Sequence, residues 1–133
     1  MGRVIKNIKI GPSPKWVMEH LESIGQRSIN NIVDATNIVM YDCGQPAHVF
    51  DFAKIKNLKL TVRNAKKSEK ITLLGGAEKT LDESMMVIAD DLGNALDIAG
   101  IKGGNYAELT KDTKDIILEC ANFDPVSVRK TAQ

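Results

Sequence analysis

Residues 30–40 read NNIVDATNIVM, and residues 44–51, a few positions further on, read GQPAHVFD. The first run sets apolar residues at helical spacing among Asn, Asp and Thr, which is more polar detail than a core helix needs. Gly44 is a stop signal for such a helix, because glycine readily takes the left-handed conformation beyond a helix C-terminus. We therefore predict a helix from about Asn31 to the residue before Gly44, followed by a Gln-Pro turn that presents His48 on a loop.

The segment before this helix predicts a strand and another helix. Residues 3–10 place apolar side chains on one face and polar ones on the other, which is typical of a strand. Ser13 and Pro14 then predict a helix start, with the serine as N-cap and the proline at the first helical position. Gly25 ends this helix. Its apolar stripe comprises Trp16, Val17, Leu21 and Ile24.

Beyond residue 57 the pattern changes to the period of two that strands have. We predict strands at residues 58–63, 71–74, 86–89, 95–101 and 115–123, with turns at residues 75–76 and 103–104. Asp124 and Pro125 open a last helix by the same capping logic. Helices that precede a run of strands indicate an α+β fold. We expect a β-sandwich-like core of mixed or antiparallel strands with flanking helices.

The composition narrows the functional classes. The chain has 18 Lys and Arg and 17 Asp and Glu, so its net charge is +1. This charge argues against tight electrostatic binding of nucleic acid, which needs several clustered cations. We interpret most of the basic residues between 54 and 70 as a solvated surface. No apolar run approaches the ~20 residues that span a bilayer, so we expect no membrane contact. Two distant cysteines, Cys43 and Cys120, favour a reduced, cytoplasmic protein.

Glu119 is the most informative single residue. It lies within the predicted strand 115–123, which is apolar on both faces, and burial of an unpartnered carboxylate there is costly. One interpretation is structural, with Lys, Arg or backbone N–H groups as partners of the carboxylate. The other is a specificity acceptor for a ligand hydroxyl, since such a site rejects an analogue without the hydroxyl by ~10⁴.

His48 also has two interpretations. A histidine on a loop acts as a general base, orients a water molecule or binds a sugar hydroxyl, but it also caps backbone groups in turns. The spacing of Cys43, His48 and Asp51 matches no common metal site, so we predict no metal. The glycines at 103 and 104 fit a plain turn or the floor of a ligand slot equally well.

Several segments, in order along the chain, together resemble the B3/B4 domain of the bacterial phenylalanyl-tRNA synthetase beta subunit. These segments are residues 11–16, 29–37, 44–51, 87–90, 98–104 and 118–125. The resemblance covers nearly the whole chain. It leads us to expect one partial tRNA-editing domain over residues 1–133, with the native domain continuing beyond both ends.

The resemblance implies a part in protein synthesis. In that family two alpha and two beta subunits form an α2β2 heterotetramer, whose alpha subunit uses ATP and Mg for phenylalanyl-tRNA aminoacylation. The B3/B4 domain hydrolyses tyrosine mischarged onto tRNA(Phe), a reaction for which the domain itself is expected to need no cofactor. The implied partners are the acceptor end of tRNA(Phe) and the alpha subunit. An editing site of this kind is needed because an apolar pocket rejects an added hydroxyl poorly.

The resemblance also implies roles for single residues. Glu119 takes the position that accepts the tyrosine hydroxyl, and His48 lies near the scissile ester, as a base or as a group that positions water or the terminal ribose. The remaining pocket residues implied are Gly100, Gly103, Thr36 and Asn37. Because a further segment also lines the family's pocket, we expect the isolated chain to be weakly active or inactive. The alternative is a non-catalytic structural or interaction module of the beta subunit.

Overall fold

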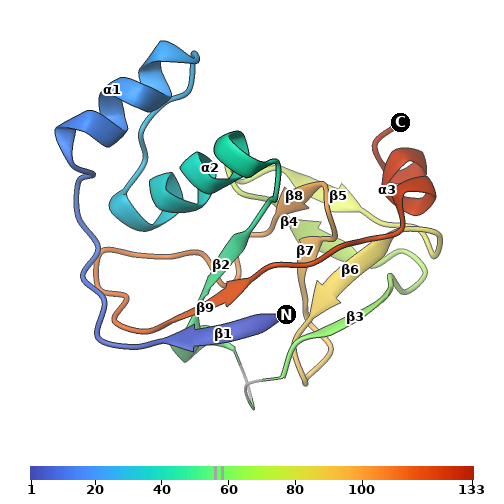
Figure 1. The fold of residues 1–133 in the computed structure, drawn as a ribbon. Helices are drawn as coiled ribbons and strands as arrows, with labels where there is room; N and C mark the ends of the chain where they lie inside the picture. Colours follow the sequence, from blue (N-terminus) through green and yellow to red (C-terminus); the bar gives the residue numbers. More distant parts are fainter. Residues whose placement is uncertain (56, 58) are drawn as a thin grey trace. The chain divides into compact units, whose positions relative to one another are not determined.

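The computed structural model describes residues 1–55, 57 and 59–133, and the chain divides into two compact units (Figure 1). The first unit comprises Met1–Ala53 and Leu109–Ala121, and the second comprises Lys54–Glu108 and Asn122–Gln133. The described residues combine helices with antiparallel strands, which confirms the predicted α+β class. None of the helices described has the length and apolar character that crossing a bilayer requires.

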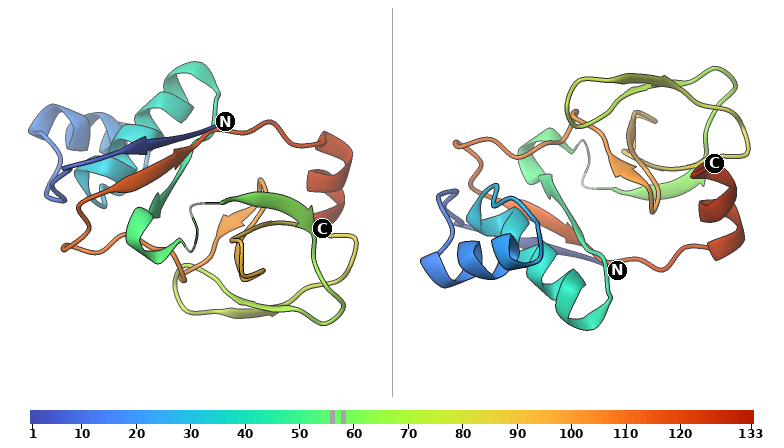
Figure 2. Two further views of the ribbon diagram at one scale, coloured as in Figure 1. Left: turned by 90° about the horizontal axis from the view of Figure 1, so that it is seen from below. Right: turned by 90° about the horizontal axis from the view of Figure 1, so that it is seen from above.

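The first unit is a three-stranded antiparallel sheet with two helices. Its elements are β1 (Gly2–Ile5), α1 (Lys15–Ser23), α2 (Asn31–Cys43), β2 (His48–Asp51) and β9 (Ile116–Glu119). Strand β9 is central, with β1 on one side and β2 on the other. Figure 2 shows both helices on one side of this sheet. Leu21 of α1 and Phe50 of β2 are almost completely buried and form part of the core.

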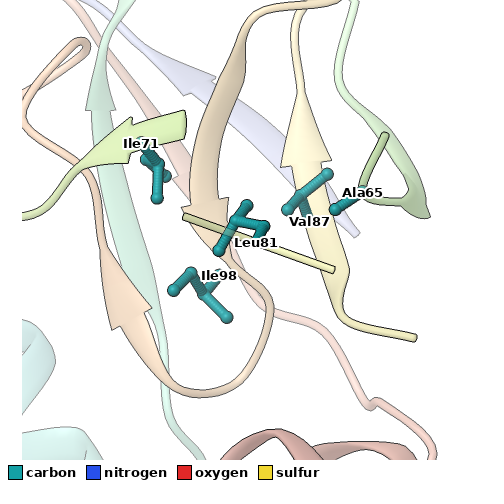
Figure 3. Close-up of a cluster of buried hydrophobic side chains, with 5 residues drawn as sticks. All are labelled: Ala65, Ile71, Leu81, Val87 and Ile98. Carbon is teal, nitrogen blue, oxygen red and sulfur yellow. The ribbon is translucent and has the colours of Figure 1, made fainter. Parts of the chain in front are cut away.

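The second unit is built from short antiparallel strands. Its elements are β3 (Thr61–Asn64), β4 (Lys70–Thr72), β5 (Glu78–Thr80), β6 (Met86–Ala89), β7 (Ala95–Ile98), β8 (Lys102–Gly103) and α3 (Pro125–Thr131). A short 3-10 helix, η1 (Phe52–Lys54), follows β2 where the chain passes from one unit to the other. The sheet order is β3-β6-β7-β8, and β4 pairs with β5 alone. Figure 3 shows the buried side chains of this unit's core, namely Ala65, Ile71, Leu81, Val87 and Ile98.

The predicted strand at residues 3–10 is too long, because β1 ends at Ile5. Asn7 has a φ of 59°, in the left-handed region, so the extended backbone is interrupted there. Its N–H donates to Oδ1 of Asp115 at 2.9 Å, which fixes this turn against the segment that leads into β9.

The start of α1 also differs from the prediction. The helix begins at Lys15 with Pro14 as N-cap and no side-chain capping bond, because the hydroxyl of Ser13 donates to Asp34 instead. The predicted apolar stripe is only partly buried. Val17 and Leu21 are buried, whereas Trp16 and Ile24 are 65% and 45% exposed.

The predicted stop of α2 at Gly44 and the predicted N-cap of α3 at Asp124 are confirmed. The side chain of Asn30 accepts hydrogen bonds from the first turn of α2, and Gly44 ends that helix in the left-handed conformation with a φ of 73°. Asp124 caps α3 by accepting from the N–H of Ser127, with Pro125 in the first turn. These signals work because each cap satisfies orphan backbone groups within a few residues of sequence.

The predicted strands of the second half lie in the expected places with shorter bounds. The prediction for β6 matches residue for residue, but β7 ends at Ile98 and β9 ends at Glu119. Leu58 lies outside the described residues, and β3 begins at Thr61. The turn at Gly75 and Gly76 is confirmed by positive φ values of 94° and 87°.

Two assignments of the sequence analysis are wrong, and one strand was missed. His48 begins strand β2 rather than lying on a loop, because β9 offers this segment a full set of cross-strand partners. Strand β5 was not predicted. Residues 103–104 were predicted as a turn, whereas Gly103 belongs to strand β8 and the reversal lies earlier, at Gly100 with its φ of 72°.

Gly104 follows β8 and has its backbone pressed against β7. Its N–H donates to the carbonyl oxygen of Leu96 at 2.8 Å. A Cβ atom on Gly104 would lie 2.1 Å from that same oxygen, far inside contact distance. Glycine is therefore required at this position by close backbone approach.

Gly104→Ala is expected to destabilise the protein by about 3 kcal/mol or more, because the clash is with backbone that cannot turn aside. The measurement is urea-induced unfolding followed by circular dichroism. Gly11→Ala is the matched control, since no atom lies within 4 Å of a Cβ there, and it is expected to change the free energy of unfolding by less than about 1 kcal/mol. Equal effects of the two substitutions would contradict this account of Gly104.

Candidate functional site

His48 and Glu119 are direct cross-strand partners. His48 is the first residue of β2, Glu119 is the last residue of β9, and the antiparallel register places them opposite one another. Side chains of opposed residues in an antiparallel pair project to the same face, with Cβ atoms about 5 Å apart. The fold therefore brings together the two residues that the sequence singled out separately.

The environment of this pair favours a neutral imidazole. Burial lowers the pKa of His48 below its usual 6.5, and the negative charge of Glu119 opposes that shift only in part. The imidazole ring also packs edge-on against the ring of Phe50, with centroids 4.8 Å apart. Oε1 of Glu119 is withdrawn from solvent. The pair thus offers a neutral nitrogen base beside a shielded carboxylate.

The turn that precedes His48 is tied to the chain beyond β9. The side-chain amide of Gln45 donates to the carbonyl of Ala121 at 3.4 Å and to that of Pro46 at 3.0 Å. Gly44 closes α2 through its N–H, which donates to the carbonyl of Met40. The Gln-Pro turn therefore joins the end of α2 to the His48 end of the sheet.

Thr36 and Asn37 lie on α2, which packs on β2. Both are half-buried. The hydroxyl of Thr36 donates to the carbonyl of Val33 in its own helix at 2.7 Å. The predicted contribution of these two residues to a ligand pocket stays a prediction.

Gly100 and Gly103 belong to the second unit, and each has a local packing role there. A Cβ on Gly100 would lie 3.1 Å from a methyl group of Val128 and 3.2 Å from the ring of Phe123. Gly103 pairs with Asp97 across the β7–β8 hairpin. That these glycines also line a ring slot stays a prediction.

Asp97 is a buried acid that the sequence analysis missed. It lies in β7 with 4% of its surface exposed, and its Oδ1 accepts a hydrogen bond from the N–H of Gly104 at 2.9 Å. Burial raises the pKa of Asp97 to about 7, and the bond from Gly104 opposes that rise. The signal was present, since Asp97 interrupts an apolar strand just as Glu119 does.

Asp34 is a second buried acid that was not recognised. It is fully buried in α2 and accepts hydrogen bonds from the hydroxyls of Ser13 and Ser28 and from the N–H of Ile29. Burial raises its pKa, but these hydrogen bonds outweigh burial and hold the pKa of Asp34 below its usual value. Asp34 is thus an ionised structural anchor that joins the two loops before α2 to the helix.

Within the part of the chain that the structure describes, no three His, Cys, Asp or Glu residues come together as ligands for an ion. Cys43 is exposed and its thiol donates to the carbonyl of Val39, so it is occupied with its own helix.

Comparison with known proteins identifies the class. Residues 1–133 match the B3/4 domain family. The chain is 50% identical over 133 residues to the phenylalanine–tRNA ligase beta subunit of Carboxydothermus hydrogenoformans and 47% identical to that of Clostridium tetani. It is covered fully in both comparisons and spans 16% and 17% of those two subunits. The chain therefore belongs to the B3/4 domain family, as the resemblance indicated.

A solved structure supports the fold. An N-terminal fragment of the phenylalanyl-tRNA synthetase beta subunit from Pyrococcus horikoshii superposes with a TM-score of 0.65 over 96% of this chain and 40% of that fragment. The sequence identity is 19%, so this likeness concerns the fold alone.

Asp97→Asn is expected to remove a pH dependence of stability. Because the folded-state pKa of Asp97 is raised from 3.8 to about 7, this group favours folding at low pH, and its contribution is lost as the pH rises towards 7. Between pH 5 and pH 8 the loss amounts to about 2 to 3 kcal/mol, which the asparagine variant should not show. The measurement is urea unfolding across this range.

Asparagine keeps an acceptor for the N–H of Gly104, so the comparison isolates the charge. Asp42→Asn, at an exposed position of α2, is the control for loss of one carboxylate. An unchanged pH slope in Asp97→Asn would show that Asp97 does not titrate near neutrality.

Proposed function

We propose that this chain is the editing part of a phenylalanine–tRNA ligase beta subunit and hydrolyses tyrosine mischarged onto tRNA(Phe). The observation that carries the proposal is the cross-strand pair of His48 and Glu119, a neutral base opposite a shielded carboxylate. The likeness to ligase beta subunits supplies the substrate class. Tyrosine and phenylalanine differ by one hydroxyl, the kind of difference that a buried acceptor discriminates well.

In this proposal Glu119 selects the substrate. The phenol O–H of tyrosine donates to the carboxylate, and the charge of the acceptor makes this bond stronger than one between neutral groups. Phenylalanine offers no donor at the same place. Binding of phenylalanine therefore lacks this interaction, and correctly charged tRNA is spared.

His48 acts on the ester. A water molecule attacks the carbonyl carbon that joins tyrosine to the terminal ribose, and the neutral imidazole either takes the proton of that water or holds the water and the ribose in place. The bond from the carbonyl carbon to the ribose oxygen breaks, and that oxygen receives a proton. The products are free tyrosine and uncharged tRNA. In this proposal water is the co-reactant, and the proton it gives up balances the one that the ribose oxygen receives.

The larger assembly follows from the same likeness. The proposal places the chain in the cytoplasm, in an α2β2 ligase whose alpha subunit carries out the ATP- and Mg-dependent charging. The acceptor end of tRNA(Phe) enters the beta subunit for editing. The chain itself contributes the editing step.

A non-catalytic structural module of the beta subunit is the second candidate. It is favoured by the local packing roles of Gly100, beside Val128 and Phe123, and of Gly103, beside Asp97. In this case Glu119 and His48 have only a structural role in the sheet.

Glu119→Ala is expected to lower the rate of tyrosine release from tyrosyl-tRNA(Phe) by roughly 100-fold, the effect of losing one hydrogen bond to a charged acceptor. The slow release from phenylalanyl-tRNA(Phe) should not change. The measurement is single-turnover deacylation with protein in excess, which detects even weak activity. Glu22→Ala, at an exposed position of α1, is the control. If the parent chain releases tyrosine no faster than phenylalanine, and Glu119→Ala gives the same rates, the editing proposal is contradicted and the chain is a structural module.

The pH profile tests His48. Hydrolysis should fall as the pH drops through the lowered pKa of His48, because the imidazolium cannot accept a proton or a hydrogen bond. His48→Ala should lose this acidic limb together with most of the rate. The assay runs from about pH 4.5 to pH 8 with spontaneous ester hydrolysis subtracted. An acidic limb that persists in His48→Ala would assign the titration to another group.

A further inference from the structure

A hollow of about 510 Å³ opens in the first unit, away from His48 and Glu119. We call it the basic hollow. It is lined by Ile8, Lys9, Ile10, Lys111, Asp112, Thr113 and Lys114. The second of its two segments leads into β9 at the end of the sheet where Asp51 pairs with Ile116, opposite the end where His48 pairs with Glu119. Figure 1 shows the two segments side by side, beyond the tip of β1.

The basic hollow concentrates positive charge. Lys9, Lys111 and Lys114 are all exposed, and Asp112 is the acidic residue among the lining side chains. Three lysines against one aspartate leave an excess of two positive charges, which is larger than the +1 of the whole chain. A cluster of exposed lysines of this kind attracts anions.

The backbone under these lysines is held firmly. The N–H of Ile8 donates to the carbonyl of Lys114 at 2.7 Å, which joins the two segments. The buried hydroxyl of Thr113 donates to Oδ2 of Asp51 at 2.7 Å and accepts from the N–H of Thr110 at 2.9 Å. The lysine stems thus project from an ordered loop, which reduces the entropy lost when a ligand binds.

We propose that the basic hollow binds the phosphodiester backbone of the tRNA, close to the acceptor end that enters the editing site. This inference rests on the proposed function, which places the terminal ribose near His48. Three residue steps of β2, at about 3.4 Å each, separate His48 from the end of the sheet that carries the hollow, a distance of about 10 Å. One nucleic acid strand advances about 3.4 Å per phosphate when stacked, so the hollow lies within a few nucleotides of the terminus.

Lysine suits this task because its ammonium group is a mobile point charge that meets phosphate oxygens without sequence preference. Ile8 and Ile10 also line the hollow, and apolar surface of this kind suits the aliphatic stems of lysine. The hollow contributes position and affinity for RNA, whereas the choice between amino acids belongs to the other end of the sheet.

The test is binding of uncharged tRNA to the chain, by fluorescence anisotropy between 50 and 200 mM KCl. Lys111→Ala with Lys114→Ala should weaken binding roughly 30-fold at 100 mM salt and make the slope of log K against log salt shallower by about 1.6, the effect of two lost phosphate contacts. Both substitutions keep the backbone bonds of the loop, and circular dichroism confirms the fold. Lys67→Ala with Lys79→Ala, two exposed lysines of the second unit, is the matched control with the same charge change.

Equal weakening by the two double variants would overturn the proposal, because RNA would then respond to net charge alone. Poly-glutamate that competes as well as RNA of equal charge would also overturn it, since the hollow would recognise any polyanion. The tRNA in this assay carries no amino acid, so binding requires no hydrolysis. A loss of binding in Lys111→Ala with Lys114→Ala therefore does not depend on tyrosine release. If the editing reaction is not observed, the RNA-binding result still stands.

Discussion

The hydrogen-bond ladder that holds β9 between β1 and β2 governs the first unit. Its register is fixed by burial, since Ile117 of β9 and its cross-strand partner Phe50 of β2 are both inside the core. A slip of one residue would turn these side chains to the opposite face and carry Glu119 away from His48. The chemistry proposed for the pair therefore depends on apolar residues that never touch a substrate.

Polar residues hold the loops and turns that the hydrogen-bond ladder does not reach. Asp34 binds the loops on either side of α1 to the start of α2, and Gln45 binds the turn after α2 to the strand end beyond β9. Hydrogen bonds to a carboxylate are stronger than those between neutral groups, so an ionised Asp34 is an effective anchor in a buried place. Asp34, one of the polar residues in the helix at residues 31–43, thus has a structural role.

Local signals predicted much of the fold. Gly44 and Asp124 were interpreted correctly because a cap acts within one turn of helix. Ser13 was not, since its hydroxyl serves Asp34, a residue in another helix. Strand β2 was missed because its partner is also distant in sequence. The segment is extended because β9 lies beside it, and nothing in residues 48–51 themselves indicates that partner.

The candidate site divides in the same way. An acid in an apolar strand pointed to Glu119, and the same argument applied to Asp97 would have found that residue too. The juxtaposition of His48 with Glu119 was outside the reach of pattern analysis, because it follows from a strand register between distant segments.

The placement of β9 also has a consequence for synthesis on the ribosome. Strand β1 pairs residues 2–5 with residues 116–119, so its hydrogen-bond partner is translated about 110 residues later. The strands of the second unit, in contrast, lie between residues 61 and 103 and pair with near neighbours in sequence. Long loops close slowly, so the second unit's sheet can form while the first unit waits for β9. Until β9 emerges, the backbone of β2 lacks its cross-strand partner, and such an open strand edge can pair with another chain and aggregate.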